Sequence, residues 1–89
     1  MERRHVIVRG FVQGVGFRYA VGRAARTRGV SGWVRNRSDG TVEAVFEGDA
    51  EDVESLVEFC RRGPRGAVVD GVDVARESAE GLTGFRVVG

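Results

Sequence analysis

The sequence predicts an α+β fold of the ferredoxin-like type, a split βαβ sandwich in which two helices cover one face of an antiparallel sheet. The first observation is the length of 89 residues, which allows one small hydrophobic core. The second is that the apolar residues alternate between a period of two, typical of strands, and a period of 3.6, typical of helices. The third is the order of these segments, βαββαβ followed by a short extra strand. We therefore expect residues 1–89 to form a single domain.

Five segments are expected to be strands: residues 5–12, 30–37, 41–47, 67–74 and 85–88. In the third of them, Val42, Ala44 and Phe46 alternate with polar residues, which favours a strand with one buried face. Asp39 and Gly40 precede it as a hairpin turn, because Gly40 can adopt the positive φ that such turns need. Short connections and right-handed crossovers then favour the sheet order 4-1-3-2, antiparallel throughout, with the fifth strand at an edge.

Two segments have helical periodicity. The first helix begins near Phe17 and ends at Gly29, which suits the left-handed position that follows a helix. The second begins after Asp49, a good N-cap, and ends at Gly63 and Pro64. The expected buried faces are Phe17, Ala20, Val21, Ala24 and Ala25 in the first helix, and Val53, Leu56, Val57 and Cys60 in the second.

The composition excludes several kinds of chemistry. All 14 basic residues are arginine, which excludes a Schiff base, a catalytic lysine and a Walker-type phosphate loop. The single cysteine excludes an internal disulfide and a cysteine-based zinc site. The single histidine excludes a histidine metal cluster, so we expect neither a metal nor a cofactor. The net charge of +1 creates no strong field for nucleic acid or a membrane.

No targeting segment is expected near the first residue. The apolar run at residues 6–8 stops at Arg9, whereas a signal peptide needs roughly 7–15 apolar residues and a membrane-spanning helix about 20. Together with the unpaired cysteine, this favours the cytoplasm.

Residues 10–18, which join the first strand to the first helix, have the composition of an anion-binding loop. Gly14 and Gly16 allow consecutive backbone N–H groups to turn inward at the start of a helix, where the helix dipole favours negative charge. Arg18 adds a fixed charge, and its two-pronged guanidinium suits phosphate oxygens. The alternative is an ordinary strand–helix connection with a solvated arginine, and these residues alone leave both interpretations open.

The predicted topology places Asn36 near this loop. The first and second strands run in the same direction with the third between them, so their C-terminal ends share one edge of the sheet, roughly 10 Å apart. Asn36 lies on the same strand face as Val34, which is the helix side, where a polar amide is unexpected. The alternative is that Asn36 fixes the backbone of the turn at Asp39 and Gly40.

Two longer motifs resemble the signatures of the acylphosphatase family. The first is Gly10-x-Val12-Gln13-Gly14-Val15-x-Phe17-Arg18, and the second is Gly32-Trp33-Val34-Arg35-Asn36-x-x-x-Gly40-x-Val42. The resemblance continues through Gly48, residues 61–64 and residues 81–85, and it covers essentially the whole chain. Because that family has a ferredoxin-like sandwich, the resemblance implies the same fold here.

The resemblance also implies roles for particular residues. The arginine that corresponds to Arg18 binds phosphate together with the amides of the loop, here Gln13, Gly14, Val15, Gly16 and Phe17. The asparagine that corresponds to Asn36 orients the attacking water. The implied reaction hydrolyses an acyl phosphate to a carboxylate and inorganic phosphate. From the residues alone, Gln13 is equally compatible with orienting the loop and with satisfying nearby backbone groups.

This reaction suits the available residues. A carboxylate leaving group, whose conjugate acid has a pKa near ~4, needs no general acid, and phosphoryl transfer needs mainly charge stabilisation and positioning. We therefore expect a small-molecule acyl phosphate as substrate and phosphate or sulfate as a product-like ligand. We expect no nucleic-acid or membrane partner, and a monomer.

Other functions fit the sequence less well. The run from Cys60 to Arg65 looks like a cysteine-phosphatase loop, but that motif needs arginine at position 66, which is glycine. Cys60 is therefore expected to be a buried thiol.

An RNA-recognition motif shares the βαββαβ order, but the third strand lacks exposed aromatic residues for stacking. A ligand-sensing regulatory domain is a further alternative. So is the acylphosphatase-like segment of a hydrogenase-maturation carbamoyltransferase, although a standalone hydrolase is favoured.

Four further side chains are expected to be structural: His5, Trp33, Arg35 and Arg37. His5 is expected to be exposed or at an edge, and Trp33 to pack against a sheet face. The two arginines are expected to pair across strands with Glu43 or Glu47.

Overall fold

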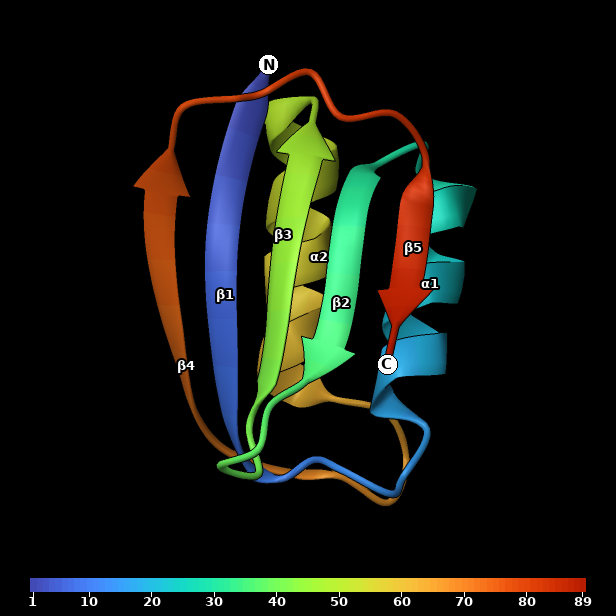
Figure 1. The fold of residues 1–89 in the computed structure, drawn as a ribbon, viewed down its shortest axis with the longest axis vertical. Helices are drawn as coiled ribbons and strands as arrows, with labels where there is room; N and C mark the ends of the chain where they lie inside the picture. Colours follow the sequence, from blue (N-terminus) through green and yellow to red (C-terminus); the bar gives the residue numbers. More distant parts are fainter.

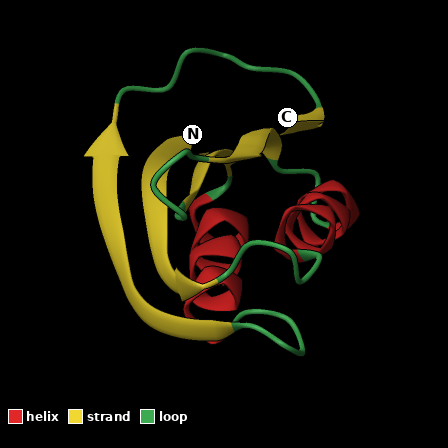
Figure 2. Cartoon of the chain, turned by 60° about the horizontal axis from the view of Figure 1, so that its bottom comes forward, coloured by secondary structure: helices red, strands yellow, loops and turns green.

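The computed structural model describes residues 1–89 and contains the expected strands and helices in the expected order (Figure 1). The strands are β1 (Glu2–Phe11), β2 (Ser31–Asn36), β3 (Val42–Gly48), β4 (Val68–Glu77) and β5 (Phe85–Val88), and the helices are α1 (Phe17–Thr27) and α2 (Ala50–Arg62). Both helices cover the same face of the sheet (Figures 1 and 2), which confirms the predicted ferredoxin-like α+β fold. Neither helix has the length and apolar character that a membrane span requires.

The sheet order is β4-β1-β3-β2-β5, which confirms the predicted 4-1-3-2 arrangement and the edge position of the fifth strand. The prediction of a wholly antiparallel sheet is correct for the first four strands. It is wrong for β5, which pairs with β2 in parallel. The reason is that β4 ends and β5 begins at the same end of the sheet, and the connection between them crosses over that end (Figure 1). As a result, β5 runs opposite to β4 and in the same direction as β2.

Strands β1 and β4 are longer than predicted. β1 begins at Glu2 rather than at residue 5, and β4 continues to Glu77 rather than to residue 74. In these extra residues Arg3 lies opposite both Glu47 and Glu77 and forms an ion pair with each at 2.7 Å. The prediction relied on alternating apolar residues, and charged residues interrupt that alternation here. Pairs of opposite charge on neighbouring strands stabilise a sheet, so the strands continue through these residues.

The hydrophobic core lies between the sheet and the helices. All four side chains predicted for the apolar face of α2 are buried, as are Phe17, Val21 and Ala25 of α1. Ala20 and Ala24, also predicted on that face, are partly exposed. Because Phe17 is the first residue of α1 and belongs to the core cluster, the core fixes where this helix begins.

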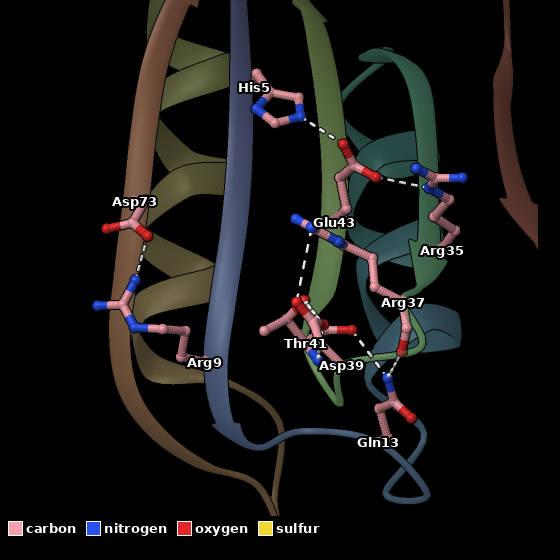
Figure 3. Close-up of polar contacts among 9 residues, drawn as sticks. All are labelled: His5, Arg9, Gln13, Arg35, Arg37, Asp39, Thr41, Glu43 and Asp73. Carbon is pink, nitrogen blue, oxygen red and sulfur yellow. Dashed lines mark hydrogen bonds and ion pairs between the residues drawn. The ribbon is translucent and has the colours of Figure 1, made fainter.

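The other face of the sheet carries polar contacts instead of helices (Figure 3). Arg35 donates a hydrogen bond of 2.6 Å to Glu43, as predicted, and its guanidinium lies 5.6 Å from the ring centre of Trp33. Arg37 was expected to pair with Glu43 or Glu47, and this is wrong. It lies just beyond the end of β2 and contacts Asp39 in the turn at 3.6 Å.

The prediction for His5 is also wrong, because the residue lies in β1, an interior strand of the sheet. Its side chain is 28% exposed, and Nε2 lies 2.6 Å from a carboxylate oxygen of Glu43. Burial alone would raise the pKa of Glu43, but the hydrogen bonds from His5 and Arg35 outweigh burial and lower it. The contact therefore ties β1 to β3 on the open face.

Glu47 of β3 fastens the connection between β4 and β5. Its carboxylate is buried and accepts a 2.7 Å hydrogen bond from Arg3. It also accepts the backbone N–H groups of Glu80, Gly81 and Leu82 at 2.8–3.1 Å. Burial alone would raise the pKa of Glu47, but these hydrogen bonds outweigh burial and lower it to about 2. A deprotonated Glu47 therefore holds the segment that delivers β5 to the sheet.

Glu47 is expected to make the free energy of unfolding depend on pH. A carboxyl group whose pKa falls from 4.5 to about 2 on folding stabilises the fold fully above about pH 4.5, and this contribution is lost as the pH falls toward 2. Glu47→Gln puts an amide NH₂ against backbone N–H donors, and it should cost about 3 kcal/mol at neutral pH. Denaturant unfolding of the wild type and of Glu47→Gln between pH 7 and pH 2 tests this. The difference in free energy of unfolding between the two proteins should shrink toward pH 2. A difference that stays constant with pH would contradict the assignment.

Candidate functional site

The candidate site lies at the edge of the sheet where β1 and β2 end. β3 lies between these two strands, and residues 12–16 lead from β1 to the start of α1 (Figure 1). This edge therefore carries the loop that the sequence indicates for anion binding, the first turn of α1 and the last residue of β2, Asn36.

Two glycines determine the shape of the loop. Gly14 and Gly16 have φ angles of 76° and 77°, in the left-handed region that residues with a side chain rarely adopt. A Cβ atom at either position would meet nothing within 4 Å. The backbone conformation, and not crowding, therefore requires glycine, and the space beside both residues is open to a ligand.

The N-terminus of α1 carries no compensating negative charge. Its N-cap is Gly16, which has no side chain to accept from the first backbone N–H groups, and its first turn contains no acidic residue. α2 differs, because Asp49 is its N-cap and Glu51 and Asp52 lie in its first turn. Free N–H groups and an uncompensated dipole make the start of α1 attractive to an anion.

Arg18 lies in this first turn and has no carboxylate partner. Its Nη1 donates a 3.0 Å hydrogen bond to the backbone carbonyl of Val88 in β5, whereas several other arginines, including Arg3, Arg9 and Arg35, are paired with carboxylates. A carbonyl contact orients the guanidinium without neutralising it. Arg18 therefore presents a positioned, uncompensated positive charge.

These groups surround one small pocket of about 180 Å³. It is lined by Val12, Gly14, Gly16, Phe17, Arg18, Tyr19 and Asn36. Pockets for drug-sized ligands are larger, roughly 300–1,000 Å³, so this one suits a small group such as a phosphate. The structure thus brings together five of the predicted site residues, while Gln13 and Val15 are not part of the pocket wall.

Gln13 instead ties the loop to the turn that follows β2 (Figure 3). Its side-chain amide donates to the backbone carbonyls of Arg37 at 2.7 Å and Thr41 at 2.9 Å. Of the two interpretations left open by the sequence, this geometry favours the satisfaction of backbone groups. The same two bonds nevertheless hold the loop against the segment that follows Asn36.

Asn36 does not fix the neighbouring turn. Asp39 accepts hydrogen bonds from the backbone N–H and the hydroxyl of Thr41 at 3.0 and 2.6 Å. Gln13 and two backbone hydrogen bonds within residues 37–41 also hold the turn. The carboxamide of Asn36 takes part in none of the side-chain hydrogen bonds of the turn and lines the pocket instead. Its donors and acceptor are therefore available to a water molecule or a ligand.

Cys60 lies outside this pocket, in the buried face of α2. Burial raises the pKa of its thiol to about 12, although the nearby Arg61 acts in the opposite direction. The nucleophilic form of cysteine is the thiolate, which is scarce at neutral pH under these conditions. The geometry therefore favours the buried structural thiol over a cysteine nucleophile.

Cys60→Ala is expected to leave the catalytic rate unchanged, because the side chain touches only the core. The truncation removes a small buried group, so the free energy of unfolding should fall by about 1–2 kcal/mol. Parallel measurements of turnover and of denaturant unfolding test this. Lost turnover in a variant with intact stability would show that the thiol takes part in the chemistry.

A larger groove of about 540 Å³ lies between α1 and α2, with Arg23, Arg28 and Arg62 among its lining residues. Its walls are the sides of helices, whose backbone N–H groups are already used within each helix. Arginine charge is present there, but no set of free backbone amides converges on it. The smaller pocket is therefore the better anion site.

Sequence reasoning missed three parts of the site, of which the first is Val12, a buried residue that follows β1 and lines the pocket. Tyr19 lines the pocket, and the signal was its position directly after Arg18, off the apolar face of the helix. The backbone carbonyl of Val88 accepts a hydrogen bond from Arg18. Every residue has such a carbonyl, so the sequence cannot indicate which one makes this contact.

Comparison with known proteins yields consistent matches. The profile of the acylphosphatase family matches residues 4–87. An acylphosphatase of Thermococcus kodakarensis is 56% identical over 87 residues, which are 98% of this chain and 96% of that protein. The crystal structure of acylphosphatase from Bacillus subtilis is 41% identical with a TM-score of 0.96, covering 100% of both chains. Full-length HypF in a phosphate- and nucleotide-bound form matches at 30% identity and a TM-score of 0.91, over 99% of this chain but 12% of that one.

Proposed function

This chain belongs to the acylphosphatase family, and from that premise we propose that it hydrolyses acyl phosphates by direct attack of water on the phosphoryl group. The products are a carboxylate and inorganic phosphate. The observation that carries the proposal is a single pocket in which three groups meet: the uncapped N-terminus of α1, the unpaired charge of Arg18 and the unused amide of Asn36.

The phosphoryl group binds at the start of α1. Backbone N–H groups of residues 14–18 donate to its oxygens, and the guanidinium of Arg18 adds charge-assisted hydrogen bonds. The carbonyl of Val88 and the hydrogen bonds of Gln13 keep these donors in place before substrate arrives. Donors that are already positioned need no reorganisation during the reaction.

Asn36 orients the attacking water from the end of β2. The water oxygen forms a bond to phosphorus as the bond between phosphorus and the acyl oxygen breaks, and the electron pair of that bond leaves with the carboxylate. The water proton passes to an oxygen of the phosphoryl group itself. Because the leaving carboxylate has a conjugate acid with a pKa near ~4, no general acid is needed.

No cofactor is required by this scheme, since Arg18 and the backbone amides supply the positive charge. The scheme uses only residues of this chain, and we propose that the protein acts as a monomer. We propose the cytoplasm as its compartment on the ground of its single, unpaired cysteine. Phosphate and sulfate are expected to occupy the pocket as product-like ligands.

Hydrolysis is expected to be independent of metal ions and selective for acyl phosphates. Benzoyl phosphate should be hydrolysed at the same rate with and without a chelator, while a simple phosphate monoester should be hydrolysed far more slowly. The reason is that an alkoxide leaving group needs either a general acid or a metal ion. Loss of activity with chelator and its recovery with zinc or magnesium would contradict the proposal.

A further inference from the structure

Tyr19 is an exposed aromatic residue at the mouth of the pocket. It is 69% exposed although it lies in the first turn of a helix whose neighbouring residues Phe17 and Val21 are buried. The side chain contributes nothing to the core cluster, so folding does not explain an aromatic residue here. Its ring centre lies 5.8 Å from the guanidinium carbon of Arg18, which places the ring directly beside the group that holds the phosphate.

The remaining wall of the pocket offers no comparable surface. Val12 and Phe17 are buried, and Gly14 and Gly16 have no side chain. Arg18 and Asn36 are polar and are already assigned to the phosphoryl group and the water. Tyr19 is therefore the one lining residue that combines a large, partly apolar side chain with high exposure.

The geometry of phosphoryl transfer determines where the acyl group goes. The attacking and leaving oxygens lie roughly in line with phosphorus, so the acyl group leaves on the side away from the water. The phosphoryl group takes up part of a pocket of about 180 Å³, so an extended acyl group reaches the mouth of the pocket, where Tyr19 lies. An exposed ring at that mouth offers a flat apolar surface to it.

We propose that Tyr19 contacts the acyl group and makes this enzyme favour acyl phosphates whose acid carries an aromatic or extended apolar group over acetyl phosphate. This rests on the proposed function, because it concerns the leaving half of the same substrate. Packing of an aromatic acyl group on the ring should strengthen binding by roughly 3- to 10-fold. Acetyl phosphate has too little apolar surface to gain from the contact.

The test compares Tyr19→Ala with Tyr19→Phe, which keeps the ring, and with Phe11→Ala, which removes an exposed aromatic residue outside the pocket. KM and kcat are measured for benzoyl phosphate and acetyl phosphate, and the inhibition constant is measured for inorganic phosphate. Tyr19→Ala should raise KM for benzoyl phosphate roughly 3- to 10-fold. It should leave acetyl phosphate and inorganic phosphate within about twofold, and both control variants should resemble the wild type.

Three results would overturn the assignment. Equal losses for both substrates and for inorganic phosphate would mean that Tyr19 acts through Arg18. An unchanged KM for benzoyl phosphate, or a loss in Tyr19→Phe as large as in Tyr19→Ala, would mean that the ring is not the contact. If the wild-type protein hydrolysed neither substrate, the proposed function itself would be wrong, and this inference would be wrong with it. If the wild type hydrolyses both substrates, any of the three results above counts against the role of Tyr19 alone.

Discussion

Replacing Arg18 with glutamine is expected to abolish measurable turnover and to weaken the binding of inorganic phosphate. The phosphoryl group is anionic both in the bound substrate and in the transition state, so the loss of Arg18 affects both. Removing one positioned donor typically lowers kcat by about 10²–10³, and here a full charge is removed as well. Phosphate affinity should fall at least ~10-fold, since hydrogen bonds to charged groups contribute about 1.5–3 kcal/mol.

Arg23→Gln is the matched control for this experiment. Arg23 lies on the same helix, is exposed and is not part of the pocket, and its loss changes the net charge by the same amount. The measurements are kcat and KM for benzoyl phosphate and the affinity for inorganic phosphate by titration calorimetry. If Arg18→Gln behaved like Arg23→Gln in both measurements, the anion would bind elsewhere and the assignment of Arg18 would be wrong.

The anion-binding loop was predictable from the sequence because its residues are close together along the chain. Gly14, Gly16 and Arg18 lie within five residues at the start of a helix, where glycine and arginine have a direct physical meaning. Asn36 is far from them in sequence, but strand order brings it to the same edge. Correct topology was therefore sufficient to place the long-range member of the site.

The remaining parts depend on contacts that no local pattern reports. The hydrogen bond from Arg18 to Val88 joins residues 70 positions apart and depends on the parallel pairing of β5, which sequence reasoning had wrong. Glu47 was expected, as an alternative to Glu43, to be a partner of Arg35 or Arg37. It pairs instead with Arg3 and with three backbone N–H groups, because β1 begins earlier than its apolar pattern indicates. Register and backbone partners are set by the whole sheet.

Asn36→Ala is expected to lower turnover by about 10²-fold or more while phosphate affinity stays within a few-fold of the wild type. Asn36 is assigned to the water, whose position matters only as it approaches phosphorus. An interaction that is made only in the transition state affects kcat and spares ground-state binding. The combination of low kcat and retained phosphate affinity therefore separates the role of Asn36 from that of Arg18.

The variant is expected to fold, because Asp39 and Gln13 hold the neighbouring turn and the free energy of unfolding should change by no more than about 0.5 kcal/mol. Ser38→Ala, an exposed change in the same turn, controls for a general disturbance and should keep wild-type turnover. Near wild-type turnover in a folded Asn36→Ala that binds phosphate would show that Asn36 does not position the water. A parallel loss of turnover and phosphate affinity, with Ser38→Ala unchanged, would also contradict the assignment to the water, because it would mean that Asn36 supports binding of the phosphoryl group itself.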